Sequence, residues 1–366
     1  MRREQINVKQ FMWLLINERI FHSAMFLLSV TSTDVGRDAW ISEIIAALGG
    51  VGLLWAVSAL ILRFPRQSII EYAPKVVGTL PGKLVGFLYI WFCFHLVMIT
   101  FRDFGELVTS IVMPETPIEV LLAVLAIAVG YGVKRGIEVI ARVNEFFLPI
   151  SIGTLVFIVG AAAKDMDLRS LKPILEKGLA LPMIGAATPF ALFGVDVAVT
   201  TMLVPLVDRP EGTRRAATAA FLIDGILGLL MTTAVLAVFG AQEARRLNFP
   251  VYELARIISI GDFLERIDVL VLGIWINMVF VKAAVFFYLG TVSMARWFNL
   301  RDYRPLVTPL GVLVVALSLR LFDDLPDLVA FFTPRVMLPY TLPVAFVVPA
   351  VLLAVALIRG QKGDAR

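Results

Sequence analysis

Five ionisable residues lie inside segments of the sequence that are otherwise strongly apolar. They are Glu18, Arg19, Asp196, Asp224 and Lys282. A charged side chain is costly at membrane depth unless it is paired or hydrated, and such residues commonly mark ligand, ion or proton pathways. We expect Lys282 to supply a fixed positive charge that Glu18 neutralises, and Asp196 and Asp224 to act in charge balance or gating. The alternative for Arg19 and Lys282 is an ordinary salt bridge, or a hydrogen bond to carbonyl groups, between helices.

Polar or glycine-containing runs interrupt two apolar segments at matching places, Asn17-Glu18-Arg19 in the first half of the chain and Phe193-Gly194-Val195-Asp196 in the second. Each is the first apolar segment of its half. Paired interruptions are typical of transporters, whose substrate sites lie at the breaks. An unwound stretch offers N–H groups at a positive helix end to a carboxylate, and freed carbonyls to an ammonium group. The breaks therefore predict a site for a small ligand such as an amino acid.

The predicted ligand-binding residues come from four apolar segments. Gly194 allows close approach of the backbone, and Phe190 and Phe193 are expected to form an apolar lid. A stripe at helical spacing in the third segment and two residues of the eighth are expected to complete the wall. The set comprises Asn17, Glu18, Tyr89, Phe92, Cys93, Pro189, Phe190, Leu192, Phe193, Gly194, Asn277 and Val279. In the alternative interpretation, Pro189 and Gly194 only kink a packed helix, and the stripe is only core.

The composition indicates that the helices carrying these residues lie in a membrane. Hydrophobic residues make up 59% of the 366 residues, charged residues only 17%, and the mean hydropathy is +0.87. About 20 helical residues cross a bilayer core of about 30 Å, so we predict an all-α, polytopic membrane protein with about ten transmembrane helices in one domain, residues 1–366. The predicted spans lie near residues 10–30, 40–62, 82–112, 118–133, 137–162, 181–205, 215–239, 267–295, 304–322 and 338–358.

Lysine and arginine collect in alternate loops and at both ends of the chain. The loop between the second and third spans alone contains Arg63, Arg66, Lys75 and Lys83. Because positive residues favour the cytoplasmic side, we expect both termini to be cytoplasmic, which agrees with an even number of spans. Two longer segments, residues 163–180 and 247–266, fall on the opposite side and resemble interfacial amphipathic helices. They are expected to cap the bundle or, alternatively, to gate the ligand path or dock a partner.

Other function classes find little support in the sequence. The net charge of +4 follows from the topology, and no basic patch with exposed aromatic residues suggests a nucleic-acid partner. Cys93 is the only cysteine and there are two histidines, which disfavours a disulfide or a metal site. No nucleophile–base pattern or phosphate loop is evident. We therefore expect neither an enzyme nor a cofactor.

Short motifs are spread along nearly the whole chain. They include Asp38-Ala39-Trp40-Ile41-Ser42, Phe64-Pro65, Pro114-Glu115-Thr116-Pro117, Gly136-Ile137-Glu138-Val139-Ile140-Ala141-Arg142, Phe249-Pro250, Arg256-Ile257-Ile258-Ser259-Ile260, Phe263-Leu264-Glu265-Arg266 and Ile274-Trp275-Ile276. In their order and spacing, more than in any single motif, they resemble the B subunit of spore germinant receptors.

The resemblance implies the spore germination permease family of the amino acid/polyamine/organocation superfamily. It implies a leucine-transporter-like fold of two inverted five-helix repeats, about residues 10–162 and 181–358, with broken helices 1 and 6. It also implies a nutrient-sensing subunit in the spore inner membrane, with an amino acid as the expected nutrient. This subunit would work with an A-type membrane subunit and a C-type lipoprotein. The alternative function is a proton-coupled amino acid permease.

Overall fold

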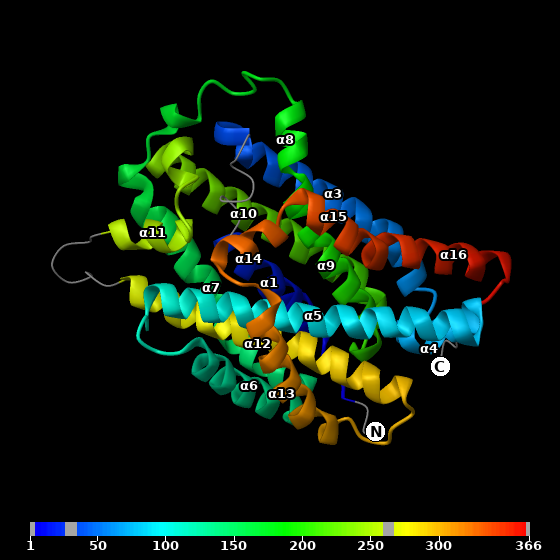
Figure 1. Cartoon of the computed structure of the whole chain (residues 1–366). Helices are drawn as coiled ribbons and strands as arrows, with labels where there is room; N and C mark the ends of the chain where they lie inside the picture. Colours follow the sequence, from blue (N-terminus) through cyan, green and yellow to red (C-terminus); the bar gives the residue numbers. More distant parts are fainter. Residues whose placement is uncertain (1–3, 26–34, 259–266, 364–366) are drawn as a thin grey trace.

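Long helices run back and forth through the molecule, roughly along one direction (Figure 1). The computed structural model describes residues 4–25, 35–258 and 267–363. The long helices are α1 (Val8–Met25), α3 (Ala39–Ile61), α5 (Thr79–Ile111), α6 (Ile118–Arg135), α7 (Ile137–Ala162), α9 (Ala187–Leu203), α10 (Thr213–Ala244), α12 (Ile267–Trp297) and α13 (Arg304–Leu321). The last span is assembled from α15 (Pro334–Leu342), a π turn (Pro343–Val347) and α16 (Val348–Ile358).

Each predicted span coincides with one of these helical segments, which confirms the all-α class. Eight helical segments in the described chain are long and apolar enough to cross a membrane. The other two, α1 and α6, each carry three charged residues among 18. Large apolar side chains such as Leu48, Ile127 and Val312 are exposed on the flanks, as expected where lipid replaces water. The chain is a multi-pass membrane protein.

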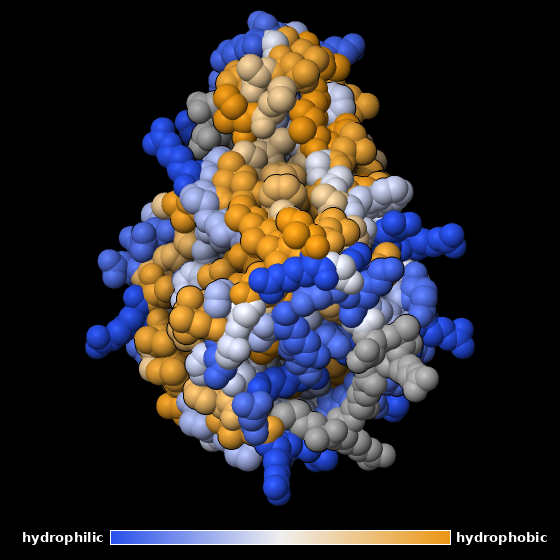
Figure 2. Space-filling view, turned by 90° about the vertical axis from the view of Figure 1, so that its right-hand side faces the viewer, coloured by the Kyte–Doolittle hydropathy of each residue, from blue (hydrophilic) through white to orange (hydrophobic). Residues whose placement is uncertain are grey.

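Both described ends of the chain lie at one end of the bundle, which we call the near end; the opposite end is the far end (Figure 1). Figure 2 shows the near end face-on, with hydrophilic residues gathered over its middle and hydrophobic residues along its flanks. The short helix α4 (Ile69–Val77) lies at the near end. The helices α8 (Ala180–Gly185) and α11 (Pro250–Ile257) lie toward the far end. The common location of the two ends agrees with an even number of spans.

Glu4 fixes the first residues of the chain across the near end. Its carboxylate accepts hydrogen bonds from the backbone N–H of Ile137 at 3.0 Å and the hydroxyl of Tyr303 at 3.1 Å, and pairs with Arg304 at 3.5 Å. Burial and the Glu4 carboxylate raise the pKa of the Tyr303 phenol, so this group remains a donor. Glu4 therefore caps α7 and connects it to the start of α13.

We expect Glu4→Ala to destabilise the protein by about 1–2 kcal/mol, because it removes a helix cap and one of the two acceptors near the buried Tyr303 hydroxyl, the other being the carbonyl of Val133. The measurement is the melting temperature of the purified protein in detergent. Gln5→Ala is the matched control, since it truncates the adjacent, exposed side chain. Equal melting temperatures for the two variants would contradict this role of Glu4.

The two predicted helix breaks are wrong in position. Helix α1 is continuous through Asn17-Glu18-Arg19, and α9 is continuous through Phe193-Gly194-Val195-Asp196. In the sixth span a single turn residue, Ala186, separates α8 from α9, and its backbone keeps helical dihedral angles (φ −67°, ψ −16°). Pro189 explains this separation, because proline has no N–H to donate to the carbonyl of Gly185. The part of the first span beyond Met25 lies outside the described residues.

The prediction of an amphipathic helix over residues 163–180 is also wrong. The segment forms two short 3-10 turns, Ala163–Asp165 and Leu168–Leu171, followed by a loop. Pro173 and Gly178 disfavour a continuous helix there. The loop is nevertheless fixed to the start of the second span, because the N–H of Leu175 donates to Asp38 at 3.1 Å. Of residues 247–266, Pro250–Ile257 form α11, and residues 259–266 lie outside the described part of the chain.

Candidate functional site

Seven ionisable side chains from six helices meet in the interior of the bundle. None is more than 3% exposed. We call this set the buried charge cluster; it comprises Glu18 and Arg19 of α1, Glu43 of α3, Asp103 of α5, Asp196 of α9, Asp224 of α10 and Lys282 of α12. Helix α1 lies at the centre, in contact with α7, α9, α10 and α12. The first helix of each half thus contributes to the same charged region.

Lys282 connects α12 to α1 within this cluster. Its ammonium group donates a hydrogen bond to the backbone carbonyl of Glu18 at 2.9 Å. Its charge also interacts with the carboxyl groups of Glu18, Asp196 and Asp103. One residue before Glu18, the amide of Asn17 donates to the carbonyl of Met278 at 3.1 Å. Side chains on the two helices therefore bond to each other's backbone, as in the alternative in which Lys282 donates a hydrogen bond to a carbonyl group.

Arg19 contacts the start of α9 in the sixth span. Its guanidinium donates to the carbonyl of Pro189 at 2.9 Å and lies 3.9 Å from the centre of the Phe193 ring. Phe193 in turn contacts the ring of Phe221, with the centroids 5.2 Å apart. Arg19 thus combines a hydrogen bond with a cation–π contact.

The cluster contains more acid than base. Among the described residues, both carboxyl oxygens of Glu18, Asp103 and Asp224, and one of Asp196, have no hydrogen-bond partner. Five carboxyl groups face two basic groups, an excess of three acids. Buried charge without a partner is strongly unfavourable. The arrangement is therefore suited to bind protons or the positive group of a ligand.

Sequence reasoning missed Glu43 and Asp103. Each lies within a predicted span, near residues 40–62 and 82–112 respectively, and each is fully or almost fully buried. Their signal is the same as that of Asp196, a carboxyl group inside an apolar run. The described residues contain no group of three or more His, Cys, Asp or Glu side chains placed to hold a metal ion.

The predicted stripe of the third span, now part of α5, faces the interior. Tyr89 donates to the carbonyl of Val344 in the π turn at 2.6 Å, and the sulfur of Cys93 lies 3.5 Å from that of Met202 on α9. The Phe92 ring is 5.1 Å from that of Tyr340. Cys93 also lies within electrostatic range of Glu18. The stripe therefore borders the charge cluster on one side and the last span on the other.

Two of the predicted ligand-binding residues, Phe190 and Gly194, pack against neighbouring helices. Phe190 is half-buried against α3, since a Cβ on Gly49 would lie 3.0 Å from its ring, and its role in an apolar lid stays a prediction. A Cβ on Gly194 would lie 2.6 Å from the methyl group of Thr341, which makes this glycine a helix contact. Asn277 is half-buried. Leu192 and Val279 are buried, and their binding roles stay predictions.

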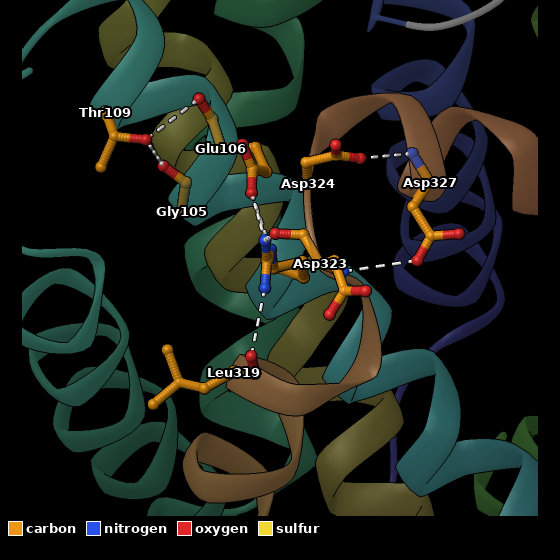
Figure 3. Close-up of polar contacts among 8 residues, drawn as sticks. Gly105, Glu106, Thr109, Leu319, Asp323, Asp324 and Asp327 are labelled. Carbon is orange, nitrogen blue, oxygen red and sulfur yellow. Dashed lines mark hydrogen bonds and ion pairs between the residues drawn. The ribbon is translucent and has the colours of Figure 1, made fainter.

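Arg102 of α5 binds the segment that joins α13 to α14 (Leu325–Phe331), and Figure 3 labels its partners Glu106, Leu319 and Asp323. It pairs with Glu106 at 2.6 Å and donates to the carbonyls of Leu319 at 3.2 Å and Asp323 at 3.0 Å, which lie at and just beyond the end of α13. Asp324 then caps α14 by accepting from the N–H of Asp327 at 2.9 Å. The corner between α13 and α14 is thereby held against α5, adjacent in sequence to Asp103.

Comparison with known proteins agrees with this architecture. Residues 5–323 match the family described as "Spore germination protein". Spore germination protein KB of Bacillus subtilis (strain 168) is 27% identical over 334 residues, which cover 89% of this chain and 88% of that protein. Spore germination protein A2 of the same strain is 23% identical, covering 79% and 78%, and spore germination protein XB of Bacillus anthracis is 26% identical, covering 78% and 79%.

A solved structure shows the same fold. The crystal structure of MhsT in complex with L-phenylalanine superposes with a TM-score of 0.71 at 13% identity, and the match covers 99% of this chain and 91% of MhsT. This confirms the predicted leucine-transporter-like fold. With a family match over nearly the whole length and a transporter fold that buries a charge cluster between its helices, the chain belongs to the spore germination protein family.

Proposed function

We propose that the protein is the nutrient-sensing subunit of a spore germinant receptor. It binds a small ligand, an amino acid, beside the buried charge cluster, and ligand binding changes the packing of α1 and α9 against the other helices. The match of residues 5–323 to the spore germination protein family carries this proposal. The complex of the structurally similar MhsT with L-phenylalanine supports an amino acid as the ligand class.

The site geometry is suited to this role. The α-ammonium group of an amino acid would meet the acid excess of the cluster, and its carboxylate would meet Arg19 or Lys282. The buried stripe of Tyr89, Phe92 and Cys93 would contact its side chain. In this proposal the protein lies in the spore inner membrane with both termini cytoplasmic, and signals to an A-type membrane subunit and a C-type lipoprotein.

Deletion of the gene in its sporulating host tests the proposal. We expect spores to lose germination in response to one nutrient in a panel of single amino acids and sugars, and the wild-type gene to restore it. Leu192→Ala should change the nutrient concentration needed, because Leu192 is buried in α9 near the cluster. Leu48→Ala on the exposed face of α3 is the control. Unchanged germination on every nutrient would contradict the sensing function.

The buried carboxyl groups favour a second candidate, a proton-coupled amino acid permease. A permease must release its ligand on the other side of the membrane, whereas a sensor need not. Uptake of labelled amino acids into proteoliposomes separates the two. Accumulation that requires an imposed pH gradient would support the permease and disfavour a pure sensor.

A further inference from the structure

A groove runs between α6 and α13 on one flank of the bundle, where the two helices lie side by side (Figure 1). Its volume is about 690 Å³. The walls include the small residues Ala123, Ala126, Gly130, Gly311 and Ala316. Larger side chains close the floor, since a Cβ on Gly130 would lie 3.5 Å from Val307, and one on Gly311 would lie 3.8 Å from the Phe287 ring of α12. The groove shares no lining residue with the buried charge cluster.

The groove is apolar over most of its length and polar at its near-end mouth, where α6 ends and α13 begins. The Lys134 ammonium group donates a hydrogen bond to the hydroxyl of Thr308 at 2.8 Å. Lys134 makes no ion pair with any described residue, and an ammonium group has two further N–H donors. The neighbouring Arg304 is already paired with Glu4 and Asp302. Lys134 therefore presents an uncompensated positive charge at the mouth.

Arg135 adds a second positive charge beside Lys134. Its guanidinium lies 5.0 Å from the centre of the Tyr131 ring, which is exposed and also lines the groove. Within the described chain, Arg135 has no carboxylate partner. Tyrosine is enriched at the level of lipid head groups, and basic pockets between membrane helices bind anionic head groups. The charge at the mouth is thus complementary to a phosphate group.

The length of the groove matches one half of a bilayer. Its lining runs from Lys134 to Ala123 on α6 and from Val307 to Leu319 on α13. At a rise of about 1.5 Å per residue these stretches are about 17 Å long. The hydrocarbon core of a bilayer is about 30 Å thick, so the groove spans roughly one leaflet. A membrane-spanning helix of a partner protein would require a contact about twice as long, whereas one acyl chain fits this length.

We propose that this groove binds an anionic phospholipid of the leaflet at the near end. One acyl chain lies between α6 and α13, and the phosphate accepts charge-assisted hydrogen bonds from Lys134 and Arg135. The small residues of the walls leave room for the chain, and Thr308 holds the lysine over the mouth. The proposal concerns the lipid-facing flank and holds whether the protein senses or transports its nutrient.

Photolabelling of the full chain in nanodiscs tests the proposal. The two probes are phosphatidylglycerol and phosphatidylcholine that carry the same diazirine-bearing acyl chain, and mass spectrometry identifies the labelled peptides. We expect phosphatidylglycerol to label the groove residues about tenfold more than phosphatidylcholine, because each basic residue near the head group favours an anionic lipid by about fivefold. Lys134→Gln keeps a donor for Thr308 and should reduce this preference by about fivefold. Lys362→Gln, at another exposed near-end lysine, should leave the preference unchanged.

A second pair of variants separates the groove from a general attraction of anionic lipid to the basic surface. Ala316 is exposed and lines the groove on α13, so Ala316→Phe should fill the space and remove most of the labelling of the groove by either probe. Ala128→Phe is the matched control, because Ala128 is exposed on α6 but lies outside the groove.

Three results would overturn the proposal. One is equal labelling of the groove by the two probes in the wild-type protein. Another is phosphatidylglycerol labelling that is spread evenly over the exposed flanks and does not change in Ala316→Phe. The third is the absence of groove labelling by either probe, since the groove would then be covered by protein, such as a second copy of this chain.

Discussion

We expect Lys282→Met to abolish function and to reduce sharply the amount of folded protein in the membrane. The variant keeps the length of the side chain but leaves five buried carboxyl groups facing Arg19 alone, and the Glu18 carbonyl loses its donor. Removing one partner from a buried charged network costs about 3–5 kcal/mol, a large part of the stability of an ordinary domain. The measurements are germination of spores that carry the variant and the melting temperature of purified protein.

Two further variants show whether the charge itself is responsible. Lys177→Met removes an exposed lysine and should behave as wild type. Adding Glu18→Gln to Lys282→Met restores the original excess of three acids, so part of the lost stability should return. A stable, fully active Lys282→Met protein would show that the ammonium group is dispensable, and absence of any recovery in the double variant would show that Glu18 is not its electrostatic partner.

Gly50→Ala has the second large expected effect. A Cβ at this position of α3 would lie 2.5 Å from the ring carbon Cγ of Phe193, which supports the guanidinium of Arg19. The added methyl group must displace the ring, and overpacking of this kind costs about 1–3 kcal/mol. We expect a lower melting temperature and impaired germination, because Arg19 loses its aromatic contact.

Helix α3 offers a matched control for this substitution. Gly52 lies two residues further along, and a Cβ there would have no neighbour within 4 Å. Gly52→Ala should leave function intact and stabilise the helix by up to about 1 kcal/mol. Combining Gly50→Ala with Phe193→Leu should recover stability, since the smaller side chain makes room. Equal behaviour of Gly50→Ala and Gly52→Ala would refute the proposed contact.

The number and order of the helices could be predicted from hydropathy because each span needs a long apolar run whatever its neighbours are. Glu18, Asp196 and Lys282 could be predicted as a group for a similar reason, since a buried charge inside such a run requires partners. Glu43 and Asp103 offered the same signal and were overlooked.

The helix breaks could not be located in this way, because polar side chains do not by themselves interrupt a helix. Helix α1 continues through this polar run. The side chains of Asn17 and Arg19 donate hydrogen bonds to the carbonyls of Met278 and Pro189 on neighbouring helices. Gly194 stays helical because it allows Thr341 to approach closely. The turn at Ala186 follows from the missing N–H of Pro189, a backbone effect. Which of these applies depends on tertiary contacts that a single sequence does not show.

The position of Cys93 has a practical consequence. It is the only thiol in the chain, and it is buried on α5 between Met202 and the neighbourhood of Glu18. A maleimide can react with it only when the helices around the site separate. The unmodified protein therefore carries its own reporter, and the labelling rate with and without each candidate nutrient would reveal which compound holds the bundle closed and which one opens it.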